Sequence, residues 1–232
     1  MSTALTLAEQ LVLLAHRGDT HKLQARTGSG TGSLDRAMQT ALIVELIELG
    51  RVGVEQRRSG GDSFILRSLT AEPTGNLSLD ALHRAIGDAK NTNKSLSGWL
   101  SPTIFAGTVV PDLCTRAIAV ERYKTFGPFR RDYRLEPVDV ALDAEIRATF
   151  DAVFYRDETA TDRDLLFAAL LADGFLWEYY APLRNHDAQM AFLARVNTLA
   201  DQRRTVSLTP VSGDGVAQVL TALRLTNSSS AT

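Results

Sequence analysis

"LDRAMQTALIVELIELG", residues 34–50, decides the fold class, because it is the most strongly helical stretch in the N-terminal part of this chain. Gly50 stands where a glycine commonly ends a helix. The preceding segment, "RTGSGTGSLD" at 26–35, is rich in helix-breaking residues and predicts a flexible loop. We therefore expect a loop, then a helix that ends at Gly50.

A shorter helix is predicted before that loop, over residues 6–15. Leu7, Leu11 and Leu14 recur at helical spacing, and Thr6 followed by Glu9 has the T-x-x-E pattern of a capping box. The opening stretch has no basic region and carries Glu9 and Gln10 within its apolar part. These features do not fit a signal peptide.

Two stretches predict β-hairpins. In "RVGVEQRRSGGDSFILRSLT", residues 51–70, Val52 and Val54 alternate with polar partners, and "SGGD" supplies a turn before a second apolar run. A second hairpin is predicted within 123–137, around Gly127-Pro128. Between the hairpins we expect helices over 79–86 and 109–122, the latter with Pro111 in its first turn.

The remainder of the chain predicts helices over about 139–155, 161–180, 185–200 and 213–225. Leu165, Leu166, Ala169, Leu170 and Leu176 form an apolar face wide enough to be buried. The predicted fold class is mainly α, with a single domain of packed helices over 1–225 and two peripheral β-hairpins. The tail "TNSSSAT", residues 226–232, is expected to be disordered.

Composition limits the function classes. The 232 residues include 25 Lys or Arg and 27 Asp or Glu, a net charge of −2, so nucleic-acid or membrane contact would need a local patch. One cysteine, Cys114, excludes an intrachain disulfide and a cysteine-based zinc site. No uncharged apolar run reaches about 18 residues, so no membrane span is predicted. A cytoplasmic protein, at most peripheral on a membrane, fits best.

No constellation typical of catalysis is legible. The four histidines lack metal-ligand spacing, which predicts surface or cap positions rather than a metal site. "GSGTGS" at 28–33 lacks the lysine of a phosphate-binding loop, and no G-x-S-x-G occurs. Trp99 and Trp177 lie in apolar surroundings and are expected to anchor the core. We expect a non-enzyme that has no cofactor, no metal and no nucleic-acid partner.

The second predicted hairpin, "YKTFGPFRRDYRLEP" at 123–137, combines cations with aromatic residues. Arginines bind anionic headgroups bidentately, and aromatic rings suit the bilayer interface. A solvated hairpin whose aromatic residues cover the helical core is an equally weighted interpretation. The cations are Lys124, Arg130, Arg131 and Arg134, and the aromatic residues are Tyr123, Phe126, Phe129 and Tyr133.

Four stretches resemble motifs of one family, in their order and spacing. They are "LTLAEQLVLL" (5–14), "ALIVELIELGRV" (41–52), "AEPTGNLSLD" (71–80) and "DRDLLFAALLADG" (162–174) followed by "APL" (181–183). Together they resemble the Golgi phosphoprotein 3 family over about residues 5–225. The resemblance implies a non-enzymatic fold of packed helices with peripheral hairpins. Its eukaryotic members bind phosphatidylinositol 4-phosphate on the membrane and retain Golgi glycosyltransferases, and the second hairpin contributes to membrane contact and self-association.

The headgroup pocket of those eukaryotic members does not carry over residue by residue. The loop at 16–34 has no Trp, and Gln39 aligns with their early arginine, with Arg36 one turn before it. Arg116 stands where they have an arginine pair. These departures and the short chain resemble bacterial, particularly actinobacterial, members, to which Golgi biology cannot apply.

Two functions from different classes remain open. The first is a peripheral membrane protein that recognises phosphatidylinositol 4-phosphate or another anionic lipid headgroup. The second is a protein-interaction or self-assembly module, possible as a homo-oligomer, that has lost the phosphoinositide pocket. The candidate headgroup residues are Arg36, Gln39, Arg116, Lys124, Arg130, Arg131 and Arg134, and the hairpin aromatic residues would face the membrane or a second copy.

Overall fold

A computed structural model describes residues 5–16, 18–22, 32–56, 64–100, 105–126, 130–181, 185–206 and 213–228. In order along the chain, its elements are α1 (Leu7–Ala15), α2 (Gly32–Glu48), β1 (Val52–Gln56), β2 (Phe64–Ser68), α3 (Leu77–Gly87), η1 (Ala89–Asn91), α4 (Leu96–Leu100), η2 (Ala106–Thr108), α5 (Val109–Thr115), β3 (Ala119–Phe126), β4 (Arg130–Pro137), α6 (Val140–Tyr155), α7 (Asp162–Asp173), α8 (Trp177–Tyr180), α9 (His186–Val206) and α10 (Gly213–Ser228). The predicted fold class, packed helices with two hairpins, is confirmed.

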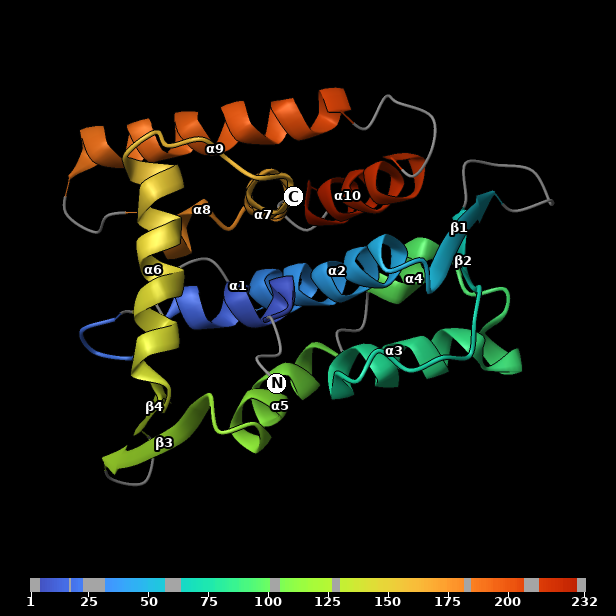
Figure 1. The fold of residues 1–232 in the computed structure, drawn as a ribbon, viewed down its shortest axis with the longest axis horizontal. Coiled ribbons are helices and arrows are strands. Elements are labelled where there is room, and N and C mark those ends of the chain that lie inside the picture. The colour runs from blue at the N-terminus through green and yellow to red at the C-terminus, as the bar shows by residue number, and fades with distance from the viewer. Residues whose placement is uncertain are drawn as a thin grey trace.

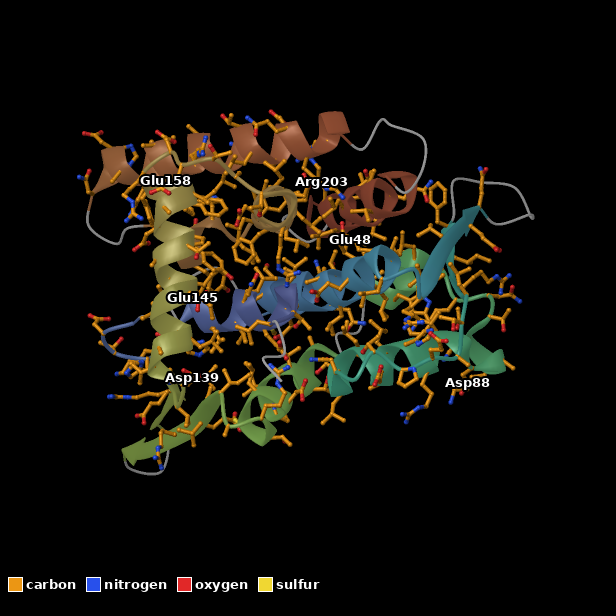
Figure 2. The ribbon with its side chains drawn as sticks, in the orientation of Figure 1. Glu48, Asp88, Asp139, Glu145, Glu158 and Arg203 are labelled. Atoms are coloured by element: carbon orange, nitrogen blue, oxygen red, sulfur yellow. The ribbon has the colours of Figure 1, made fainter. Side chains whose placement is uncertain are left out.

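Helix α2 lies at the centre of the packing (Figure 1). It contacts α1, α3, α7 and α10, and residues 37–46 are all buried. A helix that is apolar on every side must be enclosed by other elements, which explains this position. Arg203 of α9 also reaches the end of α2, with Nη2 3.2 Å from Glu48 Oε1 (Figure 2).

The hairpins lie at the periphery of the helical body (Figure 1). The first pairs β1 with β2 in antiparallel register, and the second pairs β3 with β4. Helix α6 follows β4 and crosses the body beside α1 and α9. One hydrophobic cluster unites buried residues from Leu5 to Leu223, so the described helices share a core.

The predicted caps are present. Thr6 Oγ1 accepts a hydrogen bond from Glu9 N at 3.2 Å, while Glu9 Oε2 accepts one from Thr6 N at 2.7 Å, which completes the capping box of α1. Gly50 has φ 65°, and Arg51 N donates to Leu46 O at 2.8 Å. This is the hydrogen bond that closes a Schellman motif, so Gly50 ends α2 as predicted.

Two predicted helix ends are wrong. The helix expected over 109–122 stops at Thr115, and residues 119–126 instead form β3, because pairing with β4 satisfies their backbone groups. The helix expected over 161–180 is divided into α7 and α8 at Gly174 and Phe175. A side chain at Gly174 would place its Cβ 2.6 Å from Leu170 O, so this break requires glycine.

Helices α1, α3 and α6 agree closely with their predicted ranges, whereas α9 continues past its predicted end at residue 200 to Val206, and α2 begins at Gly32, inside the segment 26–35 predicted to be a loop. Helix α10 continues to Ser228, so Thr226, Asn227 and Ser228 of the expected tail are helical, and residues 229–232 lie outside the described part. Trp99 is buried and Trp177 packs against the core, as expected of anchors. His16 and His83 are buried rather than exposed, although His16 does cap α1.

Candidate functional site

The β3–β4 hairpin separates its residues onto two faces through its register. Arg122 is opposite Arg134, Lys124 is opposite Asp132, and Phe126 is opposite Arg130. Opposed residues of an antiparallel pair share a face, and the faces alternate along each strand. Four of the cations therefore occupy positions on one face: Arg122, Lys124, Arg130 and Arg134.

The other face of this hairpin carries the pair Tyr123–Tyr133 and, beside it, Arg131 opposite Thr125. Nearer the helical body, the same face holds Ala119 and Leu135, both buried at 2% exposure. Phe129 lies outside the described residues, as do the side chains of Tyr123, Lys124, Phe126, Arg130, Arg131 and Tyr133.

At the base of the hairpin the cationic face is open to solvent. The Arg122 side chain is 61% exposed and its Nε lies 3.3 Å from Glu136 Oε2. Arg134 is half-buried. The outer edge of β4 is joined to the first loop, because Leu135 N donates to His21 O at 3.0 Å. The hairpin is thus held at its base, and β3 and β4 extend away from the helical body (Figure 1).

The three candidates outside the hairpin lie among the helices. Gln39 is fully buried, and its Oε1 accepts a hydrogen bond from Ala106 N at 3.1 Å, which holds η2 against α2. Arg36 is half-buried near the start of α2. Arg116 caps α5, with Nη2 3.2 Å from Glu9 Oε2. Gln39 and Arg116 therefore connect core elements.

Arg116 belongs to a buried polar network at the start of α1. Glu9, only 1% exposed, also accepts a hydrogen bond from Asn76 Nδ2 at 3.1 Å. Asn76 Oδ1 in turn caps α3 by accepting from Ser78 N and Leu79 N, each at 3.0 Å. A single carboxylate thus ties α1 to α3 and to the end of α5.

A second carboxylate, Glu45 of α2, holds the same helix start from another direction. Its Oε2 accepts a hydrogen bond from Leu7 N, and its Oε1 accepts one from Arg163 Nη2, both at 3.0 Å. Arg163 Nη2 also donates to Leu5 O at 2.5 Å. Leu7 N is one of the N–H groups that a helix start leaves without an internal partner, so Glu45 supplies a cap from α2.

Burial makes the charged form of both carboxylates, Glu9 and Glu45, less favourable than it is in water. Burial raises the pKa of Glu9, even though Thr6, Arg116 and Asn76 favour its charged form. Burial likewise raises the pKa of Glu45 to about 7, against the opposing attraction of Arg163. Removal from water outweighs the ion pair in each case, as is common for buried pairs.

These contacts explain the motif stretches in physical terms. Glu9, Glu45, Asn76 and Arg163 come one each from the four stretches that carried the family resemblance, and all meet around the start of α1. Sequence reasoning treated the stretches only as markers and did not predict their convergence. These four polar residues therefore connect elements of the fold around the start of α1.

Ser68, His83 and Asp80 are the residue types of a hydrolase triad and lie near one another. Ser68 Oγ lies 3.1 Å from His83 Nε2 in a surface groove that Asp80 also lines. Ser68 Oγ donates its hydrogen to Thr70 O at 2.9 Å, so His83 cannot accept it. Asp80 Oδ1 accepts from Thr74 N at 2.6 Å, and Oδ2 accepts from Gly75 N at 3.2 Å. The three side chains do not form an activated nucleophile.

The described residues form neither a metal cluster nor a membrane-spanning helix. Within the described ranges, no three His, Cys, Asp or Glu side chains are grouped so as to hold a metal ion. None of the helices described there is long and apolar enough to cross a bilayer.

Comparison with known families extends the motif evidence. The sequence model of the family described as Golgi phosphoprotein 3 (GPP34) matches residues 7–222. That range includes nearly all of the four motif stretches and confirms the resemblance found in the sequence. No curated protein matches this chain.

Proposed function

Because the chain belongs to the Golgi phosphoprotein 3 family, we propose that it binds anionic phospholipid headgroups at a membrane surface through the β3–β4 hairpin. The family resemblance favours phosphatidylinositol 4-phosphate. The protein acts as a peripheral, non-enzymatic binding protein on the cytoplasmic face of a membrane. Purified protein is expected to show no turnover of generic ester, phosphate or glycoside substrates.

The observation that carries this function is the register of β3 and β4. It assigns Arg122, Lys124, Arg130 and Arg134 to one face of a projecting hairpin, in a protein of net charge −2. Each cation near an anionic membrane contributes about 1 kcal/mol to binding. Asp132 and Glu136 occupy positions on the same face, so four cations stand against two carboxylates, and the face keeps a net positive charge although the molecule as a whole is not basic.

Within this function the candidate residues have different roles. Lys124, Arg130, Arg131 and Arg134 contact headgroups, and the aromatic residues Tyr123, Phe126, Phe129 and Tyr133 enter the interface. Arg36 remains a candidate for direct contact. Gln39 and Arg116 position other elements, since one holds η2 and the other joins the base of the hairpin to α1.

A second function is favoured by the edges of the hairpin. β3 and β4 form a two-stranded sheet, and a strand at a sheet edge is a template for pairing with another chain. The same hairpin would then serve self-assembly or a protein partner, with its aromatic residues packed against the partner.

Flotation with liposomes of increasing anionic lipid content tests the membrane function. The variant Lys124→Ala, Arg130→Ala and Arg134→Ala removes three cations from one face and should weaken binding roughly a hundredfold. Binding should also fall with added salt. A matched variant with Arg84→Ala, Lys90→Ala and Arg156→Ala loses the same charge from exposed positions elsewhere and should float like the wild type.

The outcomes separate the two functions. If the wild type does not float, or if the hairpin variant floats equally well, the hairpin is not a membrane surface. If the hairpin variant instead changes the molecular mass measured by light scattering, self-assembly is the better assignment.

A further inference from the structure

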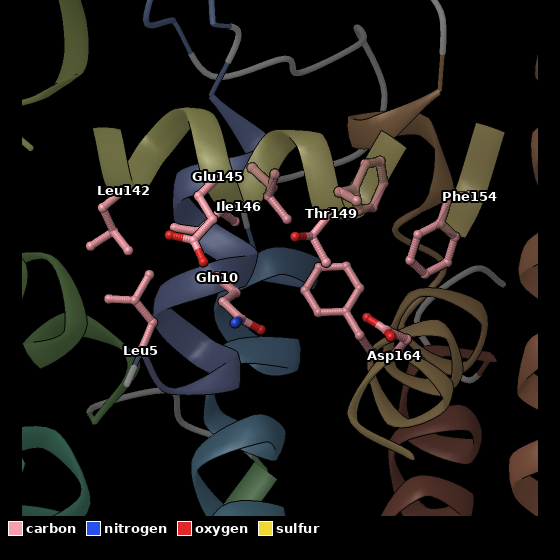
Figure 3. A pocket seen from close by; sticks show the side chains of 11 residues that line it. Leu5, Gln10, Leu142, Glu145, Ile146, Thr149, Phe154 and Asp164 are labelled. Carbon is pink, nitrogen blue, oxygen red and sulfur yellow. The ribbon is translucent and has the colours of Figure 1, made fainter. Parts of the chain in front are cut away.

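A cavity of about 190 Å³ opens between α1, α6 and α7 (Figure 3). Leu142 of α6 and Leu5, just before α1, face each other across it. Ile146 lies one turn further along α6 and also lines the cavity. A single water needs only about 10–15 Å³ by this kind of measure. The cavity is therefore large enough for a small organic molecule.

Three phenylalanines form the inner wall of this cavity: Phe150, Phe154 and Phe167. The rings of Phe150 and Phe154 stack with centroids 4.6 Å apart, and Phe167 meets Phe150 edge-on at 6.0 Å. All three are at most 9% exposed, so packing holds them in place. This wall is apolar and suits an alkyl or aryl group.

The charged groups of the cavity are of one sign. Glu145 of α6 and Asp164 of α7 both direct their carboxylates toward the space between the helices (Figure 3). Asp164 Oδ2 also caps α7 by accepting from Thr161 N at 2.8 Å. Among the described residues that line the cavity, none is Lys, Arg or His.

Two cations on adjacent turns are directed elsewhere. Arg147 of α6 donates through Nη2 to Leu13 O at 3.1 Å and through Nε to Asp143 at 2.9 Å. Arg163 is bonded to Glu45 and to Leu5 O. Neither guanidinium is hydrogen-bonded to Glu145, which is exposed at the rim of the cavity, so the charge of the described lining stays negative.

We propose that this cavity binds a small organic cation with an apolar body, such as a protonated alkylamine or a quaternary ammonium compound. The charged nitrogen lies near Glu145, beside Leu5, Leu142 and Ile146, and the alkyl or aryl body extends from there toward the phenylalanine wall. An alkyl carboxylate of the same length fits the apolar part but is repelled by Glu145 and Asp164, so charge provides the selectivity.

Calorimetric titration without any lipid tests this site separately from membrane binding. Octyltrimethylammonium is the cationic probe, and octanoate is the anionic probe of equal chain length. The cation should bind and raise the melting temperature, whereas octanoate should do neither. Glu145→Gln should weaken binding of the cation roughly three- to tenfold. Glu55→Gln, on exposed β1, removes the same charge elsewhere and should leave binding unchanged.

A second variant tests the location. Thr149 is exposed at the rim of the cavity, so Thr149→Trp should fill the space and abolish binding while the protein remains folded by circular dichroism. The site is disproved if octyltrimethylammonium does not bind, if octanoate binds as tightly, or if Glu145→Gln or Thr149→Trp binds like the wild type. Each result is independent of liposome flotation.

Discussion

At the scale of single residues, the two buried carboxylates at the start of α1 have a cost as well as a role. Glu9 and Glu45 each accept a backbone N–H near the first turn, and each has an arginine partner. Burial nevertheless raises both pKa values, so ionisation works against the folded state there. Their role is to hold helices in place, because their contacts join α1 to α2, α3, α5 and α7.

The Glu45 carboxyl should make stability depend on pH. Its pKa is about 7 in the folded protein and 4.5 for an ordinary Glu, so between these values the folded state holds a proton that the unfolded chain has lost. Acidification from pH 8 to pH 5 should therefore stabilise the folded state through this group, by at most ~3 kcal/mol. In Glu45→Gln this gain should disappear, as measured by melting temperature against pH.

Other titrating groups also make stability depend on pH, so the pH profile of Glu45→Gln must be compared with that of the wild type. Burial lowers the pKa of His16, which destabilises the folded state as pH falls below 6.5 and acts in the opposite direction. His16 remains in both proteins, so the difference between their pH profiles isolates Glu45. Glu48→Gln, at the exposed end of α2, should keep the wild-type slope. Identical slopes for wild type and Glu45→Gln would contradict the assignment.

Asn76 should contribute strongly to stability, because one side chain both caps α3 and hydrogen-bonds the buried Glu9. Asn76→Ala removes the cap of α3 and the hydrogen bond to buried Glu9, so we expect a loss of about 1–2 kcal/mol or more in the free energy of unfolding. Urea denaturation measures it. Asp88→Ala removes the exposed cap of the three-residue η1 and should cost much less. Equal losses would show that the Glu9 contact is unimportant.

At the scale of elements, three helices end in the same way although only one has glycine at the left-handed position after its end. Beyond α2, α5 and α7, the residues with positive φ are Gly50 (65°), Ala117 (57°) and Phe175 (53°). The residue after each donates to a carbonyl five positions earlier: Arg51 to Leu46, Ile118 to Leu113, and Leu176 to Leu171. All three are Schellman motifs.

Buried apolar contacts explain the two motifs that lack glycine. Ile118 and Leu176 follow the strained residues and are buried, as are Leu113 and Leu171 to which they are bonded. A hydrophobic contact between these positions commonly accompanies the motif, and it offsets the cost of a left-handed residue with a side chain.

Reciprocal substitutions should reveal that cost. Ala117 is exposed, so Ala117→Gly should relieve the left-handed strain and stabilise the protein by about 0.5–1 kcal/mol. Gly50→Ala should destabilise it by about 1 kcal/mol, although a Cβ there meets no atom within 4 Å. Both values come from chemical denaturation. The two substitutions should change the free energy of unfolding in opposite directions. If both variants are destabilised, the explanation for Ala117 is wrong.

At the scale of the whole molecule, one hydrophobic cluster connects the described helices. Phe192 of α9 lies 6.1 Å from both Phe150 and Phe154 of α6, measured between ring centroids, and Phe167 of α7 meets the same pair. Tyr155 Oη donates to Tyr180 O at 2.5 Å and adds a polar link from α6 to α8. Because these contacts are shared, no part of the described core can be removed without exposing another.

We expect the protein to unfold as one cooperative unit. Trp99 in α4 and Trp177 in α8 are separate fluorescent reporters, isolated by Trp177→Phe and Trp99→Phe respectively. Each single-tryptophan variant should give the same denaturation midpoint by fluorescence as by far-UV circular dichroism. Distinct midpoints for the two probes within one variant would indicate separable cores and would contradict a single domain over residues 1–225.

The sequence by itself determined the features that depend on neighbouring residues. The Thr6–Glu9 capping box, the glycine that ends α2 and the alternation in β1 each involve groups only a few positions apart. The order of the four motif stretches also identified the family correctly. In the candidate site, the hairpin and its cations were legible because they occupy one continuous segment.

Only the tertiary structure decided where distant groups meet. Asn76 contacts Glu9 across 67 positions of the chain, and Arg163 contacts Glu45 across 118. The burial of Gln39, which aligned with a headgroup-binding arginine, follows from the enclosure of α2 by the helices packed around it. The ends of α5 and α7 depend on Ile118 and Leu176 finding buried partners. Local hydrogen-bond patterns can be read along the chain, but burial is set by every element that packs against a residue.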